Sequence, residues 1–254
     1  MKPSFIAIIP ARYASSRFPG KPLAKIGETE MIVRVARQVS KAVDNVIVAT
    51  DDERIRECVE HNGFRCVMTS ADHRSGTDRI AEAYRKTGSD ADVVINVQGD
   101  EPFIRPEQIE SLKKIFLSRP DARIATLVRP FDPSKGFEAL FDPNLVKVIF
   151  SDNMQALYFS RSIIPYIRGK EWKEWLDSAR FHSHIGIYAY RADELQRITQ
   201  LPQSSLEIAE SLEQLRWLQA GIPIEVATSN YPTIGIDTPE DLAEAERLLN
   251  EATQ

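Results

Sequence analysis

The sequence predicts an α/β protein with a mixed, mostly parallel sheet flanked by helices, and three observations support this. Short apolar runs alternate with segments of helical spacing along the first half of the chain. Within each run nearly every residue is apolar, as expected for strands buried on both faces of a parallel sheet. After about residue 125 strands follow one another without long helices between them. That change predicts a smaller antiparallel region at about 128–190.

Two kinds of pattern define the individual elements. Strands are predicted where short apolar runs are bounded by turn residues, at 5–10, 46–49, 66–68, 93–97, 146–150, 156–159, 185–190 and 224–228. Helices are predicted where apolar residues recur every three or four positions, at 31–41, 51–62, 77–87, 106–117, 204–219 and 238–250. The segment 166–177 combines two tryptophans with charges and is predicted to be a loop or a short helix.

Capping residues support the helix borders. An aspartate, Asp51 or Asp52, begins the second helix, and Gly88 follows the third. Pro106 occupies the first position of the fourth. Thr238 and Asp241 form a capping-box pattern at the start of the last.

The composition is that of a globular protein. The chain has 254 residues, 43% of them hydrophobic, and a formal net charge of −5. This acidic balance argues against a nucleic-acid partner. No apolar stretch approaches the roughly 20 residues of a membrane helix, so we expect no membrane partner. Two cysteines outside any metal-binding spacing, with no export signal, fit a reducing cytoplasm. No linker interrupts the chain, and we expect one domain over 1–254.

The loop after the first strand carries the strongest chemical signal. It places Arg12, Arg17 and Lys21 in one connection at the carboxyl end of a strand, where α/β sheets bind ligands. One arginine side chain can bind two phosphate oxygens at once, and lysine adds a point charge. The loop therefore predicts a triphosphate clamp, with a solvated basic loop as the alternative. Neither a P-loop nor a GxGxxG pattern is present.

Two aspartates are candidate metal ligands. Asp100 comes just beyond the strand 93–97, and Asp237 stands immediately before the last helix. Magnesium prefers oxygen ligands and takes one or two carboxylates together with substrate phosphates. The alternatives are a turn at Asp100 and a helix cap at Asp237.

Several sequence blocks resemble those of a known family. IPAR at 9–12 and SRFPGKPL at 16–23 resemble the signature of sugar nucleotidyltransferases. Six further blocks are similar, in the expected order, to the 3-deoxy-manno-octulosonate (Kdo) cytidylyltransferases, or CMP-Kdo synthetases. They are ADHRSGTDR (71–79), NVQGDEP (96–102), LYFSR (157–161), HIGIY (184–188), LEQLR (212–216) and IDTPEDL (236–242).

The resemblance implies a nucleotide-diphospho-sugar transferase fold whose antiparallel region helps to form a homodimer. It implies that CMP is transferred from CTP to the anomeric hydroxyl of Kdo, giving CMP-Kdo and pyrophosphate. This reaction serves lipopolysaccharide biosynthesis in the cytoplasm and uses Mg²⁺, which Asp100 and Asp237 would hold.

The resemblance also assigns residues. Those implied to bind the nucleotide are Pro10, Ala11, Arg12, Arg17, Lys21, Asp72, Arg74, Ser75 and Gln98. Those implied to bind the sugar acid are Gln98, Arg161, His184, Tyr188, Glu213 and Gln214, with Arg161 at its carboxylate. The implied catalytic residues are Arg12, Lys21, Asp100 and Asp237. The spacing itself indicates that His184 and Tyr188 share one face of a strand.

One departure from the family pattern concerns the sugar. Ser183 stands where the family commonly has a basic residue before the HIGIY block. An 8-amino Kdo analogue is therefore an alternative substrate, and a sialic-type sugar acid is a separate alternative. A nucleotide-binding protein without turnover is the alternative from another class.

Overall fold

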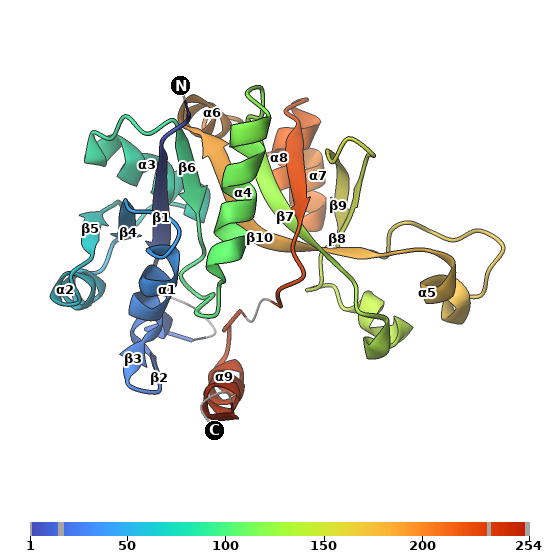
Figure 1. Cartoon of the computed structure of the whole chain (residues 1–254), viewed down its shortest axis with the longest axis horizontal. Helices are drawn as coiled ribbons and strands as arrows, with labels where there is room; N and C mark the ends of the chain where they lie inside the picture. Colours follow the sequence, from blue (N-terminus) through green and yellow to red (C-terminus); the bar gives the residue numbers. More distant parts are fainter. Residues whose placement is uncertain (1, 15–17, 233–234, 252–254) are drawn as a thin grey trace. The chain divides into compact units, whose positions relative to one another are not determined.

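The chain divides into two compact units. The computed structural model describes residues 2–14, 18–232 and 235–251 (Figure 1). The first unit comprises 1–110 and 232–254, and the second comprises 111–231, so the predicted antiparallel region of about 128–190 lies inside the second. In the described ranges, no helix has the length and apolar character needed to cross a membrane.

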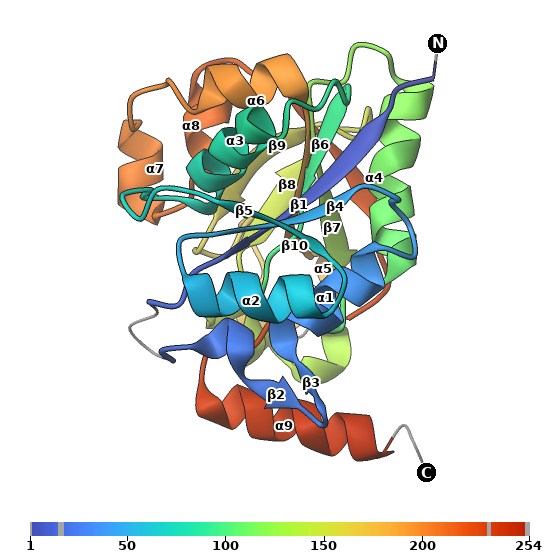
Figure 2. The ribbon, with the colours of Figure 1, turned by 90° about the vertical axis from the view of Figure 1, so that its left-hand side faces the viewer.

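The first unit is built on parallel strands in the order β6-β1-β4-β5. Their bounds are β1 (Phe5–Ala11), β4 (Val46–Thr50), β5 (Arg65–Met68) and β6 (Val93–Asn96). All residues of β4 and β6 are buried, which explains their continuous apolar runs. The helices α1 (Met31–Val39) and α2 (Glu53–His61) lie on one side of these strands, and α3 (Gly76–Thr87) lies on the other (Figure 2).

A second, smaller layer completes the first unit. It contains the short helix η1 (Lys21–Leu23), the hairpin β2 (Lys25–Ile26) and β3 (Thr29–Glu30), and α9 (Pro239–Glu251). Ile26, Met31, Ile236 and Ala245 are buried together here. This cluster packs α9 against the hairpin, and Figure 2 shows the two elements side by side.

The second unit is a mixed sheet. In it β7 (Ile124–Pro130) pairs in parallel with β11 (Ile224–Thr228) and antiparallel with β10 (His182–Arg191). The antiparallel strands β8 (Lys147–Phe150) and β9 (Ala156–Ser160) extend from β10. The helical elements are η2 (Pro133–Lys135), η3 (Phe137–Phe141), η4 (Trp172–Glu174), α5 (Trp175–Ser178), α6 (Ala192–Ile198), α7 (Ser205–Glu210) and α8 (Gln214–Gln219). Helix α4 (Pro106–Ser118) crosses the boundary between the units.

The predicted fold class is confirmed, and so are the caps. The side chain of Asp52 accepts from the Arg54 amide at the start of α2, and Gly88 ends α3 in the left-handed conformation. Thr238 and Asp241 accept from each other's backbone amides, as a capping box requires.

One predicted helix was wrong, and several elements were missed, among them β2, β3, β7 and α6. The strand β7 was missed, because its apolar run lies where the rhythm of the sequence changes. The helix predicted at 204–219 is two helices, because Ser211 between them has a left-handed backbone with φ 51°. The segment 166–177 contains the short helices η4 and α5.

Gly99 allows the end of β6 to approach the end of β1. A Cβ atom at this position would lie 2.7 Å from the carbonyl oxygen of Pro10, a backbone atom that cannot rotate away. The absence of a side chain therefore lets two neighbouring strand ends meet, and Asp100 is the next residue.

We predict that Gly99→Ala lowers the free energy of unfolding by about 1–3 kcal/mol, because the backbone must shift to admit the methyl group. Chemical denaturation measures this change. The control is Gly235→Ala, where a Cβ would contact nothing within 4 Å. A Gly99→Ala protein within about 0.5 kcal/mol of the parent would contradict the close approach.

Candidate active site

A cavity of about 500 Å³ lies in the first unit at the carboxyl ends of β1 and β6. It is lined by Pro10, Ala11, Arg12, Ala14, Lys21, Pro22, Gly76, Arg79, Gln98, Gly99, Asp100 and Asp237. Seven of the predicted site residues thus meet here, from stretches far apart in the sequence. Arg17, also predicted, lies outside the described residues.

An ion-pair cluster stands in this cavity. The ammonium Nζ of Lys21 lies 2.7 Å from Oδ2 of Asp100 and 3.1 Å from Oδ1 of Asp237. The Lys21 side chain is only 13% exposed, so water screens these contacts less than those of a surface pair. The two predicted carboxylates therefore converge on a single cationic position.

Backbone contacts hold Asp237 in place. The amide of Ile236 donates to the carbonyl oxygen of Asp100 at 3.0 Å, which ties the two segments together. The amide of Asp237 donates to the carboxylate of Asp241 at 2.9 Å. The capping of α9 thus falls to Thr238 and Asp241, and it leaves the Asp237 carboxylate beside Lys21.

The converging carboxylates fit a divalent cation. In the described ranges, no group of three or more His, Cys, Asp or Glu side chains is arranged to hold a metal. Two aspartate oxygens within about 3 Å of one nitrogen do, however, provide the one or two carboxylates that Mg²⁺ uses when phosphates and water supply its remaining ligands.

The loop 72–77, which is predicted to contact the nucleotide, reaches the same cavity through Gly76. Arg12 donates from Nη1 to the carbonyl oxygen of His73 at 3.4 Å, and Ser75 caps α3 by accepting from the amide of Asp78. Asp72 and Arg74 are exposed and do not line the cavity. Their contacts with a nucleotide stay predictions.

Glu82 on α3 anchors this loop. Its carboxylate accepts from the Ser70 amide, contacts the His73 ring and pairs with Lys86. Burial alone would raise the pKa of Glu82, but these hydrogen bonds outweigh it and lower the pKa to about 2. The carboxylate is therefore charged at neutral pH, and it fixes the loop through its contacts with Ser70 and His73.

Two functional candidates were missed from the sequence. Arg79, which ends the ADHRSGTDR block and was assigned no role of its own, is 1% exposed and donates to Asp51 and Thr69. Glu101 has a buried carboxyl oxygen, Oε2, without a partner among the described residues. Burial and the neighbouring Asp100 raise the pKa of Glu101 to about 8, so it is largely protonated at neutral pH. The sequence could not identify these two side chains, because only contacts with residues distant in the chain bury them.

In the second unit, predicted sugar-binding residues also come together. The rings of His184 and Tyr188 on β10 lie 5.3 Å apart, which confirms that they share a face. Burial lowers the pKa of His184 to about 3 and raises that of Tyr188 well above its usual value, so both are neutral. Glu213 and Gln214 stand at the start of α8, and Gln214 is buried with an Nε2 that has no partner among the described residues. Such an orphaned donor fits a site that awaits a polar ligand.

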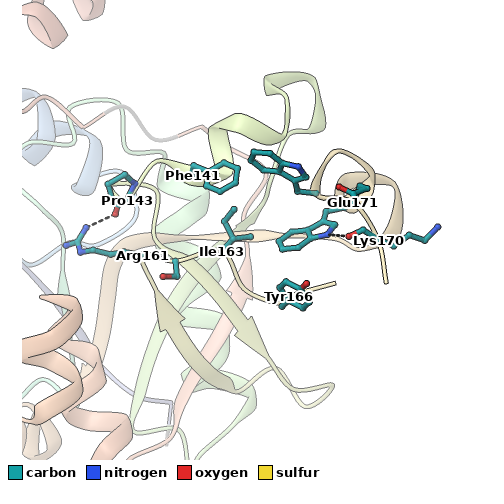
Figure 3. A pocket seen from close by; sticks show the side chains of 10 residues that line it. Phe141, Pro143, Arg161, Ile163, Tyr166, Lys170 and Glu171 are labelled. Carbon is teal, nitrogen blue, oxygen red and sulfur yellow. Dashed lines mark hydrogen bonds between the residues drawn. The ribbon is translucent and has the colours of Figure 1, made fainter. Parts of the chain in front are cut away.

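Arg161 follows β9 and faces backbone oxygens (Figure 3). Its guanidinium donates to the carbonyls of Pro143, Glu210 and Ser211, at 2.8, 2.6 and 3.3 Å respectively. Two of these bonds hold the corner between α7 and α8 in place, and the third holds Pro143, so three of the five N–H groups are used. A contact with the sugar carboxylate stays a prediction and would have to use the remaining two.

Ser183, the departure from the family pattern, is nearly buried on β10. Its hydroxyl lies 3.5 Å from the carbonyl oxygen of Arg129, and its strand partner in register is Lys147 on β8. Lys147 is fully buried, its Nζ donates to the carbonyl of Asp142, and burial lowers its pKa. A basic residue thus lies opposite Ser183, on the neighbouring strand.

Comparisons with known proteins agree on one family. Residues 6–225 match the family model described as cytidylyltransferase. The chain is 59% identical to the 3-deoxy-manno-octulosonate cytidylyltransferase of Parabacteroides distasonis, over 96% of this chain and 98% of that protein. Its counterpart in Phocaeicola vulgatus is 58% identical over 97% and 98%. A solved structure of CMP:2-keto-3-deoxy-manno-octonic acid synthetase complexed with CTP superposes with a TM-score of 0.90 at 42% identity, covering 98% of this chain and 99% of that one.

Proposed function

The chain belongs to the cytidylyltransferase family, and we propose that it transfers CMP from CTP to Kdo, giving CMP-Kdo and pyrophosphate for lipopolysaccharide biosynthesis. The observation that carries this proposal is the cavity in which Lys21, Asp100 and Asp237 meet beside Arg12 and Gln98. Cations and carboxylates in one cavity are the parts that a nucleotidyl transfer requires.

The first unit supplies the nucleotide half of the reaction. Arg12 and Lys21 offset the negative charge that builds on pyrophosphate as the anomeric hydroxyl displaces it from the α-phosphorus. Pro10, Ala11 and Gly99 let the ligand approach the backbone. The buried ion pair of Arg79 with Asp51 keeps the wall of the cavity rigid.

Asp100 and Asp237 are the proposed holders of Mg²⁺. When bound, such a cation neutralises phosphate charge and lowers the pKa of a nearby hydroxyl. In the structure, the Lys21 ammonium pairs with both carboxylates and offsets part of their mutual repulsion.

The second unit supplies the sugar half. Neutral His184 and Tyr188 are suited to the hydroxyl groups of a sugar, which both donate and accept hydrogen bonds. Glu213 accepts such bonds, and the orphaned Nε2 of Gln214 donates one.

Pyrophosphate release tests the activity directly. We expect the highest kcat/KM with CTP and Kdo among the four nucleoside triphosphates and a panel containing Kdo, 8-amino Kdo and a sialic acid. Release with another pair only would overturn the substrate assignment. Binding of CTP, seen as a thermal shift, without any release would favour a nucleotide-binding protein instead.

We predict that Asp100→Asn lowers kcat by on the order of 100-fold or more, because one of the two cation-binding carboxylates is lost. Titration of Mg²⁺ in the pyrophosphate assay measures activity and metal affinity together. The matched control is Asp44→Asn, at an exposed turn of the same unit. Near-parental turnover of Asp100→Asn at low Mg²⁺ would remove this carboxylate from the metal site.

Homodimer formation and a cytoplasmic location complete the proposal. In the second unit, a cavity of about 690 Å³ is bordered by aromatic side chains (Figure 3). Of these, Phe141 is 50%, Tyr166 73% and Trp172 48% exposed. Large apolar side chains gathered at a surface are typical of an interface. The free thiols of Cys58 and Cys66 fit a reducing compartment such as the cytoplasm.

We predict that Tyr166→Glu weakens the dimer by about 10-fold or more, because the interface would have to bury an unpaired charge. Sedimentation over a concentration series measures the dissociation constant. Tyr231→Glu, at another exposed tyrosine of the same unit, is the control. A parental protein that sediments as a monomer at all concentrations, or an unchanged dimer in Tyr166→Glu, would contradict the proposed surface.

A further inference from the structure

An irregularity in β10 surrounds the side chain of Thr126. The partner of Ile185 is Leu127, whereas that of Tyr188 is Thr126, so β10 advances three residues where β7 advances one. Between them the carbonyls of Ile185 and Ile187 turn toward Thr126, whose Oγ1 lies 3.2 and 2.8 Å from them. The buried hydroxyl of Thr126 thus lies next to two carbonyl oxygens that backbone amides would bind in a regular pair of strands.

The single proton of this hydroxyl decides the direction of its hydrogen bonds. Carbonyl oxygens only accept, so the contact at 2.8 Å from Ile187 requires that the Thr126 proton lie between the two oxygens. The lone pairs of Oγ1 are then left for its other polar neighbours, the Tyr188 hydroxyl and Nε2 of His184, the latter at 3.0 Å. That contact is a hydrogen bond only if Nε2 carries the proton.

The second ring nitrogen of His184 must then be an acceptor. The burial described above keeps the ring neutral, and a neutral imidazole has one N–H, so Nδ1 carries a lone pair. Within the described part of the chain, Thr126 is the hydrogen-bond partner recorded for this ring. The rings of Phe159 and Tyr188 pack against it at 5.1 and 5.3 Å and hold its plane.

We propose that Thr126 is a positioning residue that fixes His184 in the Nε2–H tautomer, so that Nδ1 accepts a hydrogen bond from a hydroxyl group of the sugar acid. The second half of this proposal rests on the proposed function. An acceptor-only nitrogen selects an O–H donor and disfavours a carboxylate or phosphate oxygen at the same place. His184 therefore recognises a hydroxyl group of the sugar rather than its negative charge.

The first test is spectroscopic and requires no substrate. Long-range ¹H–¹⁵N correlation of the full chain, labelled at its four histidines, reports which ring nitrogen of each carries the proton. The His184→Gln variant identifies the His184 signals. We expect a protonated Nε2 and a bare Nδ1 in the parent and in Thr126→Ser, and a mixed or reversed tautomer in Thr126→Val. A parental ring protonated at Nδ1, or an unchanged tautomer in Thr126→Val, overturns the proposal.

The second test is kinetic. We expect Thr126→Val to raise the KM for Kdo by about 2- to 10-fold, the range of one neutral hydrogen bond, with the KM for CTP unchanged. Thr126→Ser should restore the parental KM for Kdo, because it keeps the hydroxyl. An altered tautomer with an unchanged KM for Kdo overturns the sugar contact.

Absence of turnover by the parent with Kdo overturns the proposed function, whereas the spectroscopic result still decides the role of Thr126. If Thr126→Val does not fold, the parental tautomer and Thr126→Ser decide it.

Discussion

The position of Lys21 between Asp100 and Asp237 is the interaction on which the candidate active site depends. Two carboxylates drawn toward one point repel each other unless a cation lies between them. The ammonium group supplies this cation, and it joins the loop after β1, the end of β6 and the start of α9. Under the proposed function, a divalent ion that replaced the ammonium would find both carboxylates already close together.

Backbone geometry, rather than side-chain charge, brings these groups within reach. Parallel neighbours β1 and β6 end at the same edge of the sheet, so the residues that follow them start side by side. Gly99 then lets the second segment pass close to Pro10. The C-terminal segment joins through the amide of Ile236, which donates to the carbonyl of Asp100. The backbone of the fold thus brings Lys21, Asp100 and Asp237 close together, and the attraction between their charges then brings them into contact.

Local rules predicted the strands and caps of the first unit well, because each depends on neighbouring residues. They failed where a distant contact decides the structure. The apolar spacing of 204–219 continues through Ser211, yet the helix breaks there. Carbonyls at this break, on Glu210 and Ser211, receive hydrogen bonds from Arg161, some 50 residues earlier. Arg79 was assigned no role for the same reason, since its partner Asp51 lies 28 residues earlier in the chain.

The break at Ser211 links these failures to function. A left-handed backbone at a serine is strained, and it persists only where surrounding contacts hold it. Here Arg161 holds it, and the next residues, Glu213 and Gln214, begin a new helix with the Nε2 of Gln214 buried and unpartnered among the described residues. A buried donor without a partner costs about 1–3 kcal/mol. Under the proposed function, a sugar hydroxyl that accepted a hydrogen bond from this Nε2 would recover that free energy on binding.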